Sequence, residues 1–501
     1  MVSTEDETMN TNTLLNTDDY EGARQARDPR FDGRFFVGVL TTGIYCRPVC
    51  PVRVPKKKNV QLYKSAASAA AAGFRPCLRC RPESSPGTPA WSGSSWKVSR
   101  ALQLIDQGFL DDGSVDDLAE QLEVGPRQLS RLFSEHLGAS PVEVAQTRRL
   151  HFAKKLLDET DMNLSQICFA SGFGSVRRFN AVFNKIYGRS PKEIRKKRKI
   201  SRKAVNNIEL TLFYRPPYDW QALLAFLAYR AIPGVETVTE NSYARTICID
   251  GVAGHVVAMF DSGSNSIRLS ICYPETRHLY HIIDQMRSVF DLRADSTQID
   301  KFLGKDKLLK PMVKKFPGLR VPGCWSGFEV AVRAILGQQV TVKAASTLVA
   351  RIAQRHGTPY DCDIEGLDFT FPQPADLESA DLAGLGIVGQ RIEAIQAVAK
   401  LLTSEKLRID CSIETEEFIA TICAVKGIGE WTAQYIAMRA LNDPNAFPYS
   451  DLILRRAAAK KGEELTAKKL LLRSEPWQPW RAYSVILLWR YYNYSQSLSK
   501  G

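Results

Sequence analysis

The sequence lacks any stretch that approaches the ~20 consecutive apolar residues required by a membrane-spanning helix. Residues 1–20 are polar and acidic, so the apolar segment of a secretory signal is missing as well. These two absences exclude the membrane and secreted classes, and we expect a cytoplasmic protein with no membrane partner. Residues 1–21 are expected to form a disordered leader.

A disulfide framework is also missing. The cysteines number eleven, which is an odd count, and most of them stand singly in apolar surroundings: Cys168, Cys248, Cys272, Cys324, Cys362, Cys411 and Cys423. Such usage is typical of a reducing compartment and excludes the class of small disulfide-rich proteins.

Acidic residues are in the minority. The 501 residues include 67 Lys or Arg against 54 Asp or Glu, giving a formal net charge of +13 and a pI of about 9.1. A basic surplus favours a polyanionic partner, most often nucleic acid, although a generally basic protein without such a partner has the same composition. The length predicts several domains, since a domain usually has roughly 100–200 residues.

Composition divides the chain into four blocks and two linkers. The first block holds clustered cysteines, the second has apolar residues at helical spacing, the third mixes strands with helices, and the fourth is strongly helical. In chain order the blocks and linkers are 22–82, 83–95, 96–192, 193–207, 208–320 and 321–501. In the third block, strands are expected at 244–249, 255–260 and 266–272, and helices at 220–231 and 277–290.

Four cysteines in the first block have the spacing of a zinc site. Cys46, Cys50, Cys77 and Cys80 form two close pairs, with three, twenty-six and two residues between them. Such pairs enclose one tetrahedral Zn²⁺ ion with four thiolates. The formal charge of that site is −2, which makes its sulfur atoms electron-rich and nucleophilic. From the spacing alone, a purely structural zinc site is the alternative.

The residues around the quartet resemble a known family. The segments 28–30, 41–50 and 71–80 are similar to the N-terminal zinc domain of the Ada alkylation-response regulators, and the second reads Thr-Thr-Gly-Ile-Tyr-Cys-Arg-Pro-Val-Cys. The resemblance implies that Cys46 irreversibly accepts a methyl group from a methylphosphotriester in DNA. Methylation would change the charge of the site from −2 to −1, which lessens repulsion of the DNA backbone and raises affinity for DNA.

Two helix-turn-helix patterns lie in the second block. The first predicts helices at 115–122 and 127–137, and the second predicts helices at 164–170 and 175–187. An ordinary amphipathic helix pair is the alternative for either pattern alone. Polar side chains on the second helix of each pattern are expected to contact DNA: Arg127, Arg131, Arg177 and Arg178.

Joined by a long helix at 141–157, the two patterns resemble the AraC-type DNA-binding domain, most clearly over 171–191, which ends Tyr-Gly-Arg-Ser-Pro. The resemblance implies two recognition helices about one turn of DNA apart, ~34 Å, and activation of transcription through RNA polymerase. The proline-cysteine-histidine motif of Ada's C-terminal alkyltransferase is absent. Direct reversal of O6-methylguanine is therefore not expected.

A glycine hairpin and an aspartate mark the fourth block. Gly427 and Gly429 lie between two helical stretches, where backbone N–H groups and the start of the next helix can clamp a DNA phosphate. Asp451 follows the hairpin within the sequence Phe-Pro-Tyr-Ser-Asp-Leu. A Gly-x-Gly turn alone is only a weak sign of such a clamp.

The hairpin, the loop and the aspartate together resemble the helix-hairpin-helix glycosylase superfamily, and matching stretches between Arg215 and Tyr483 resemble its AlkA group. The resemblance implies that Asp451 stabilises an oxocarbenium-like sugar and positions water as an alkylated purine leaves, with no cofactor. Trp431, Tyr435 and Trp480 are expected to stack on the extruded base through cation–π attraction. Core packing is the alternative for each ring.

Departures from related glycosylases narrow the expected chemistry. Lyase members carry a lysine at the second position after the hairpin, where this chain has Trp431, so we expect a monofunctional hydrolase. No cysteine follows Cys423, so the iron–sulfur loop of the endonuclease III group is missing. Gln339 occupies the position of the leucine that wedges into DNA, and Leu452 replaces an aromatic residue after the aspartate.

The sequence thus predicts a multidomain fold class: a small α+β zinc domain, an all-α AraC-type double helix-turn-helix, an α+β AlkA N-terminal domain and an all-α helix-hairpin-helix glycosylase domain. The expected function is removal of alkylated purines of the 3-methyladenine type, fused to a zinc-thiolate methyl acceptor that activates transcription. The expected partners are double-stranded DNA, both alkylated and promoter, and RNA polymerase, in a bacterial cytoplasm. The rival interpretation is a DNA-binding transcription regulator with structural zinc and a catalytically silent glycosylase half.

Overall fold

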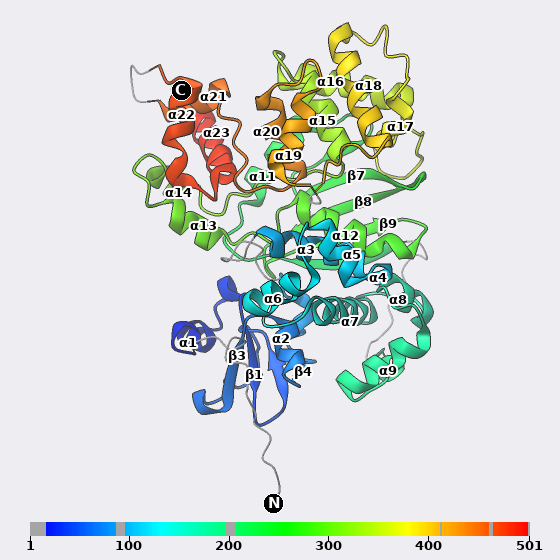
Figure 1. The fold of residues 1–501 in the computed structure, drawn as a ribbon, viewed down its shortest axis with the longest axis vertical. Coiled ribbons are helices and arrows are strands. Elements are labelled where there is room, and N and C mark those ends of the chain that lie inside the picture. The colour runs from blue at the N-terminus through cyan, green and yellow to red at the C-terminus, as the bar shows by residue number, and fades with distance from the viewer. Residues whose placement is uncertain (1–16, 87–95, 196–206, 411–412, 460–463, 499–501) are drawn as a thin grey trace, which may run out of the picture. The chain divides into compact units, whose positions relative to one another are not determined.

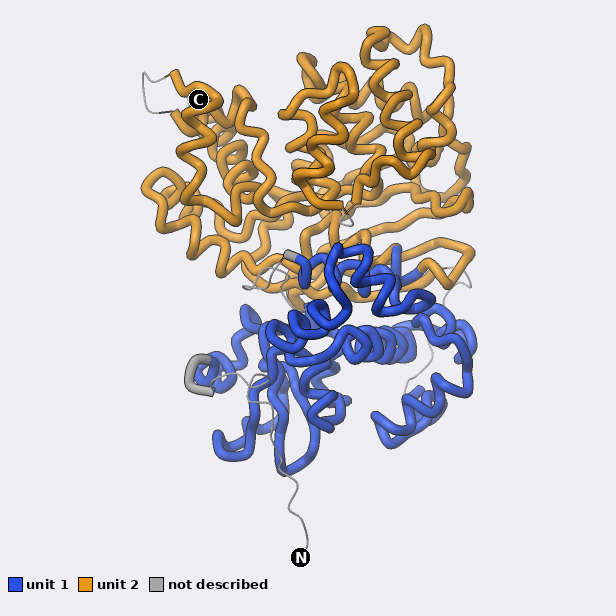
Figure 2. The backbone as a smooth tube through the Cα atoms, viewed as in Figure 1, with its two compact units in different colours: residues 1–201, 279–281 blue, residues 202–278, 282–501 orange. Residues whose placement is uncertain are grey.

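The computed structural model describes residues 17–86, 96–195, 207–410, 413–459 and 464–498. The chain forms two compact units (Figure 2), one of residues 1–201 with 279–281 and one of residues 202–278 with 282–501. None of the described helices combines the length and the apolar content that a membrane span requires. The mixture of α and α+β parts is the multidomain class that the sequence predicts.

The sheet of the first unit positions the first cysteine of each close pair. Its strands have the order β3-β1-β2-β4, and Figure 1 labels β1, β3 and β4. Strand β1 pairs antiparallel with β2 and β3, whereas β2 and β4 run parallel, with Tyr45 opposite Pro76. Because parallel strands end at the same edge, Cys46 and Cys77 leave the sheet side by side. The strands are β1 (Phe36–Val39), β2 (Ile44–Cys46), β3 (Val60–Tyr63) and β4 (Arg75–Pro76).

Helix α1 corrects the expected leader. It spans Thr17–Ala26, so residues 17–21 are helical rather than disordered, and residues 1–16 lie outside the described chain. The Tyr20 ring packs against Phe35, the residue before β1, with ring centroids 5.0 Å apart, and this contact secures the helix. The other helical segments of this part are η2 (Pro29–Phe31), η3 (Lys57–Asn59), α2 (Ala66–Ala71) and η4 (Pro82–Ser84).

The rest of the first unit is helical, as predicted. Ser114, Ser140 and Asn163 each cap a helix by accepting a hydrogen bond from the backbone N–H three residues later, within a reciprocal capping box. These caps explain why the helices begin where the sequence indicates. The helices are α3 (Trp96–Asp106), α4 (Phe109–Asp112), α5 (Val115–Gln121), α6 (Pro126–Leu137), α7 (Pro141–Glu159), α8 (Leu164–Ala170), α9 (Val176–Tyr187) and α10 (Pro191–Arg195).

The second unit contains an antiparallel sheet with the order β5-β9-β8-β7-β6. Trp220, at the start of α11 (Trp220–Arg230), stacks on Phe260 of β8 with ring centroids 5.3 Å apart, which fixes this helix against the sheet. The predicted strands at 244–249, 255–260 and 266–272 all lie within strands of this sheet. The strands are β5 (Asn207–Phe213), β6 (Glu236–Val238), β7 (Ser242–Ile249), β8 (Val252–Asp261) and β9 (Ser266–Cys272).

Among the remaining helices of the second unit, α15 is buried from Phe328 to Leu336 and packs against α16, α18 and α20. The predicted glycine hairpin joins α19 to α20, and Asp451 begins α21. The helices are α12 (Leu279–Val289), α13 (Ser296–Leu303), α14 (Lys310–Lys315), α15 (Gly327–Leu336), α16 (Val342–His356), α17 (Pro374–Leu377), α18 (Gly389–Thr403), α19 (Thr415–Cys423), α20 (Glu430–Ala440), α21 (Leu452–Ala458), α22 (Ala467–Arg473) and α23 (Arg481–Leu498), with η5 (Thr276–His278) and η6 (Glu475–Trp477).

Candidate functional site

The predicted metal ligands meet at one point of the first unit. Cys46, Cys50, Cys77 and Cys80 are buried, and their sulfur atoms all lie within 4.8 Å of one another. Zinc binds thiolates at about 2.3 Å, so a tetrahedral site needs sulfur atoms roughly 3.8 Å apart. The donors and their spacing therefore fit zinc. Within the described ranges, no other group of three or more His, Cys, Asp or Glu side chains gathers this closely.

Arg47 joins the two halves of the quartet. Its backbone N–H donates to the Cys80 sulfur at 3.3 Å, and its guanidinium donates to the Cys80 carbonyl at 3.1 Å. The Nε atom of the same guanidinium donates to a carboxylate oxygen of Asp32 at 2.9 Å. Because the guanidinium is almost fully buried, its positive charge offsets part of the negative charge of the thiolates.

A partly buried polar contact connects β2, the strand that ends at Cys46, to α7. The hydroxyl of Tyr45, the residue before Cys46, lies 2.8 Å from Nε2 of His151. Burial, together with the nearby Lys154 ammonium, lowers the pKa of His151 to about 4. The imidazole is therefore neutral at pH 7 and shares one hydrogen bond with the phenol.

An ion-pair cluster makes a second connection to α7. Arg81, the residue after Cys80, lies 3.0 Å from a carboxylate oxygen of Asp158 and 3.0 Å from one of Glu159. Lys154 lies 3.5 Å from the carboxylate of Glu83, and both of these side chains are buried. The residues beside the cysteines are thus tied to the helix that joins the two helix-turn-helix patterns.

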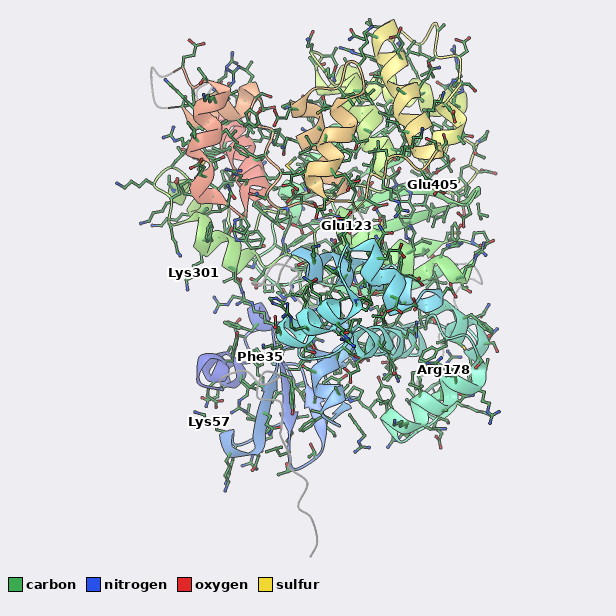
Figure 3. The ribbon with its side chains drawn as sticks, viewed as in Figure 1. Phe35, Lys57, Glu123, Arg178, Lys301 and Glu405 are labelled. Carbon is green, nitrogen blue, oxygen red and sulfur yellow. The ribbon has the colours of Figure 1, made fainter. Side chains whose placement is uncertain are left out.

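The four arginines predicted to contact DNA lie on exposed faces of two helices. Arg127 and Arg131 are on α6, and Arg177 and Arg178 are on α9, where Figure 3 labels Arg178. The opposite face of each helix is a buried stripe with a spacing of four residues: Leu129, Phe133 and Leu137 on α6, and Phe179, Phe183 and Tyr187 on α9. This pattern leaves the four guanidinium groups in solvent, where they can face a phosphate backbone or a groove, although Arg131 lies 3.9 Å from the Glu135 carboxylate.

The second unit holds a pocket of about 700 Å³ between α11, α15, α16, α20, α21 and α23. Asp451 lines it and caps α21, accepting a hydrogen bond from the Leu454 backbone N–H at 2.9 Å. The indole N–H of Trp431 donates to one carboxylate oxygen at 3.1 Å, and the indole N–H of Trp489 donates to the other at 3.3 Å. Both oxygens are therefore oriented, and the carboxylate is held at the wall of the pocket.

The aromatic residues of the pocket differ from the prediction at one position. Trp431 and Tyr435 stack in parallel, with centroids 5.5 Å apart, as their four-residue spacing on α20 predicts. Trp480 does not line the pocket: it is buried edge-to-face against Tyr483, with centroids 5.7 Å apart. Trp489 lines it instead. Sequence reasoning missed Trp489, whose only signal was its place within the apolar run of α23.

Tyr435 carries an unusual electrostatic environment. Its phenol accepts a hydrogen bond from Arg439 at 2.9 Å. Burial acts to raise the pKa of Tyr435, but the guanidinium groups of Arg439, Arg230 and Arg333 outweigh it and lower the pKa to about 8. Arg439 in turn donates to the carbonyls of Pro322 at 2.6 Å and Gly323 at 2.7 Å, which fixes its position.

The predicted DNA-contacting loops lie close to each other. Gly427 has a φ of +93°, which favours glycine, and Gly429 precedes α20 with its neighbouring N–H groups at the start of that helix. Gln338 donates to the Gly427 carbonyl at 3.0 Å and so joins the hairpin to the loop between α15 and α16. In that loop Gln339 is exposed and has a φ of +56°, a strained value for a residue other than glycine.

Four protein families match successive parts of the chain. The metal binding domain of Ada matches residues 20–83, and a helix-turn-helix domain matches residues 118–197. The AlkA N-terminal domain matches residues 209–326, and the HhH-GPD superfamily of base excision DNA repair proteins matches residues 332–481. The four kinds of domain predicted from the sequence are therefore confirmed, and the cysteine quartet is a zinc site of the Ada type.

Known proteins resemble the chain as a whole and in part. A Mycobacterium tuberculosis protein described as a probable bifunctional transcriptional activator/DNA repair enzyme AlkA is 37% identical over 479 residues, which are 94% of this chain and 96% of that protein. DNA-3-methyladenine glycosylase 2 of Escherichia coli is 33% identical over 282 residues, which are 56% of this chain and 96% of that enzyme.

One solved structure supports the fold of the second unit. A 3-methyladenine DNA glycosylase from Archaeoglobus fulgidus covers 56% of this chain and 98% of its own length, with a TM-score of 0.51 and 24% identity. Together with the near-complete match to the mycobacterial protein, these findings settle the relationship. The chain belongs to the family of AlkA-type bifunctional transcriptional activators and DNA repair proteins.

Proposed function

We propose that the second unit is a monofunctional DNA glycosylase that hydrolyses the N-glycosidic bond of alkylated purines such as 3-methyladenine. The observation that carries this proposal is the Asp451 carboxylate, fixed by two indole N–H groups at the wall of a pocket with aromatic lining. A pocket of about 700 Å³ has room for a nucleotide that has been extruded from the duplex. The similarity to 3-methyladenine glycosylases supports the same substrate class.

The residues suggest how bond cleavage proceeds. An alkylated purine is cationic, so the electron pair of the C1′–N bond passes to the base and the base leaves neutral. The Asp451 carboxylate stabilises the positive charge that develops on the sugar, and it orients the water that attacks C1′. The proton lost by that water passes to solvent, and an abasic site remains. Trp431 and Tyr435 stack on the extruded base through cation–π attraction.

Two loops are proposed to hold the DNA during this reaction. The hairpin with Gly427 and Gly429 would bind a phosphate with the N–H groups at the start of α20. Gln339 would enter the space that the extruded nucleotide leaves. Its exposure and its strained backbone, next to the Gln338 contact with the hairpin, support this role.

Asp451→Asn tests the glycosylase directly. Asparagine keeps the hydrogen bond that caps α21 but removes the negative charge, so the fold should persist. We expect wild type to release 3-methyladenine from methylated DNA and the variant to release it about 100-fold to 10,000-fold more slowly, measured as free base. A wild-type protein that binds this DNA and releases no base would support the binding-only regulator instead.

For the first unit we propose that Cys46 accepts a methyl group from a methylphosphotriester in DNA, with one Zn²⁺ held by the quartet. When bound, zinc would keep the cysteines as thiolates at neutral pH. The Cys46 sulfur attacks the methyl carbon, and the bond between that carbon and the phosphate oxygen breaks. The electron pair of this bond stays on the oxygen, so the phosphotriester becomes an ordinary phosphodiester. The hydrogen bond from the Arg47 N–H to Cys80 makes that competing sulfur less nucleophilic.

We further propose that the methylated first unit binds a promoter through α6 and α9 and recruits RNA polymerase. Loss of one negative charge at the quartet would weaken its repulsion of the DNA backbone. The exposed arginines on both helices support DNA contact. This role and the base-excision role together make the protein a repair enzyme that also regulates the response to alkylation.

Mass spectrometry and metal analysis test the methyl acceptor. After incubation with methylated DNA, the wild-type peptide containing Cys46 should carry one added methyl group, and the corresponding peptide of Cys46→Ser should carry none. Elemental analysis should find one zinc per chain. An unmodified Cys46 peptide from a zinc-loaded protein would leave the quartet with a structural role only.

A further inference from the structure

The rim of the pocket in the second unit consists of side chains that are exposed to solvent, unlike the rest of the lining. Most of the lining is buried or half-buried, but the rim exposes Ala225 and Tyr229 of α11, Val340 of the loop before α16, and Arg490 and Asn493 of α23. Tyr229 is 61% exposed, more than any other large apolar or aromatic side chain that lines the pocket. A large aromatic ring is thus held in water at the entrance of a site that takes in a nucleobase.

The sequence of α11 explains why Tyr229 faces the pocket. Ala222, Ala225, Phe226 and Tyr229 all line it, and their spacing of three, four and seven residues from the first places them along one face of the helix. The two alanines are small, so the two rings are the aromatic groups that α11 presents to the pocket, beside the buried Leu223. Helix α11 therefore provides an aromatic wall in addition to the Trp431–Tyr435 wall of α20.

The two rings on α11 have different surroundings. Two guanidinium groups hold Phe226, since Arg230 lies 3.8 Å and Arg439 lies 5.0 Å from its ring centroid. Tyr229 has only a distant cation–π contact with Arg230, at 5.8 Å. Phe226 is consequently part of the packed interior of the pocket, whereas the faces of the Tyr229 ring are largely open to a partner.

An exposed tyrosine at the rim of the pocket is well suited to pack on a bound nucleotide. Aromatic rings stack on bases of any sequence, and tyrosine keeps its hydroxyl in water while its ring is covered. Burying the ring on a bound nucleotide also removes apolar surface from water. The neighbouring Arg490 offers a positive charge to phosphate, which is a contact of a different kind and with a different salt dependence.

We propose that Tyr229 is a specificity-determining residue whose ring packs on the extruded nucleotide at the pocket rim. The inference rests on the proposed glycosylase function and extends it by one substrate contact outside the buried pocket. This contact forms only when a nucleotide leaves the duplex. It therefore raises the affinity for DNA with an extruded nucleotide but not for intact DNA. A contact with a phosphate would instead raise the affinity for both equally.

The experiment compares Tyr229→Ala, Tyr229→Phe and Arg490→Gln in the full chain. Single-turnover excision is followed on a duplex containing one 7-methylguanine, and binding to the same duplex without the lesion is measured separately. We expect Tyr229→Ala to raise the half-saturating protein concentration for excision about tenfold, the loss typical of one base–aromatic stack. Tyr229→Phe should stay within twofold of wild type, and neither variant should change binding to the intact duplex.

Two comparison variants distinguish loss of the proposed Tyr229 contact from loss of a phosphate contact and from loss of any exposed apolar side chain. Arg490→Gln should weaken binding to both duplexes and lower the slope of log affinity against log salt by about one, which Tyr229→Ala should not do. Leu472→Ala removes a similarly exposed apolar side chain, 56% exposed on α22 and outside the pocket, and should change nothing. Equal thermal unfolding of all four variants confirms that folding is intact.

Two results would overturn the proposal. One is a Tyr229→Ala protein that excises like wild type. The other is a variant that loses affinity for intact and damaged duplexes alike, because the ring would then contact ordinary DNA. If wild type itself excises no base, the proposed glycosylase function fails first, and this outcome is distinct from both.

Discussion

At the scale of single residues, the proposed base excision by the second unit depends on the orientation of the Asp451 carboxylate. Each oxygen accepts an indole N–H, from Trp431 at 3.1 Å and from Trp489 at 3.3 Å, and the backbone N–H of Leu454 adds a third bond. These donors hold the charge in one direction without supplying a counter-charge. The carboxylate can therefore face a developing positive charge on a sugar with little reorganisation.

Trp489→Phe should slow base excision because it removes one of these donors while keeping a ring of similar shape. We expect the excision rate to fall about tenfold, as for the loss of one hydrogen bond to a charged group, about 1.5 kcal/mol. Trp480→Phe is the matched control: that indole is buried beside Tyr483 and away from the pocket, so excision should stay within twofold. Equal losses in both variants would indicate a general packing effect.

Tyr435 should be the first tyrosine of the second unit to ionise. Its pKa is lowered to about 8 because Arg439, Arg230 and Arg333 outweigh the effect of burial, whereas burial raises the pKa of Tyr483 in the same unit. Titration followed by phenolate absorbance should find one group near pH 8 in wild type. That group should be missing in Tyr435→Phe and should move to higher pH in Arg439→Gln; an unchanged titration curve in either variant would refute this account of the arginines.

The two tryptophans show what the sequence can and cannot predict about the site. Asp451 and the cysteine quartet follow from local motifs with fixed spacing, and the structure brings the predicted ligands and the predicted acid to suitable places. Trp480 and Trp489 belong to one segment that opens and continues α23, and both have apolar neighbours. Which of them reaches the pocket depends on how α23 packs against α21, a long-range contact that local sequence does not encode.

At the scale of secondary-structure elements, α7 has a double role. It joins the two helix-turn-helix patterns, and it carries His151, Lys154, Asp158 and Glu159, which contact the segments beside the cysteines. If α7 only connected the two helix-turn-helix patterns, its charged side chains would be expected to lie on the solvent-exposed surface. Here Lys154 and Glu83 are both buried, so their pairing is required by the packing.

Lys154→Met should destabilise this part of the chain by up to about 3 kcal/mol, because the buried Glu83 carboxylate then keeps only Arg81, at 3.4 Å, as a cationic partner, and Asp158 loses its contact with Lys154. Burial already raises the pKa of Glu83 although Lys154 opposes it. A raised pKa means that the folded state binds the proton more readily than the unfolded state, so the destabilisation should shrink as the pH falls and the carboxyl becomes neutral.

Hydrogen exchange of the α7 amides in the full chain measures this effect as a free energy of local opening. The double variant Lys154→Met/Glu83→Gln is the control and should recover most of the lost stability, since both charges of the Lys154–Glu83 pair are then removed. An opening free energy that is unchanged in the single variant, or that falls by the same amount at every pH, would argue against a buried pair.

Most elements could be predicted because their signals are local. The alternation of apolar residues marks β9, and the capping residues Ser114, Ser140 and Asn163 mark three helix starts. Helix α1 had no such signal, since its polar sequence looks like a leader and only the packing of Tyr20 on Phe35 gives it a place in the fold. The parallel pairing of β2 with β4 likewise joins segments far apart in the chain.

At the scale of the whole molecule, the two proposed reactive centres belong to different compact units. The cysteine quartet lies in the first unit, and every residue that lines the pocket with Asp451 lies in the second. Each unit has its own buried core. The chemistry of one centre therefore needs no residue from the other.

Removal of zinc with a chelator should separate the two activities. Zinc holds together strand ends that are far apart in sequence, so the first unit should lose thermal stability and its capacity to accept a methyl group. Base excision by the same full-length protein should remain within twofold of its original rate. A parallel loss of excision would contradict the independence of the second unit, and restoration of zinc provides the control.

The length of α7 has a consequence for the regulatory DNA. Its 19 residues form one uninterrupted helix about 28 Å long, so a stiff spacer joins the two helix-turn-helix patterns that are proposed to bind DNA through α6 and α9. Inserting five base pairs between the two halves of an operator turns the second half to the opposite side of the double helix. A rigid spacer cannot follow that rotation, whereas ten inserted pairs restore the phase but double the gap. Operators that are bound through both α6 and α9 should therefore lose affinity when either five or ten base pairs are inserted between their halves.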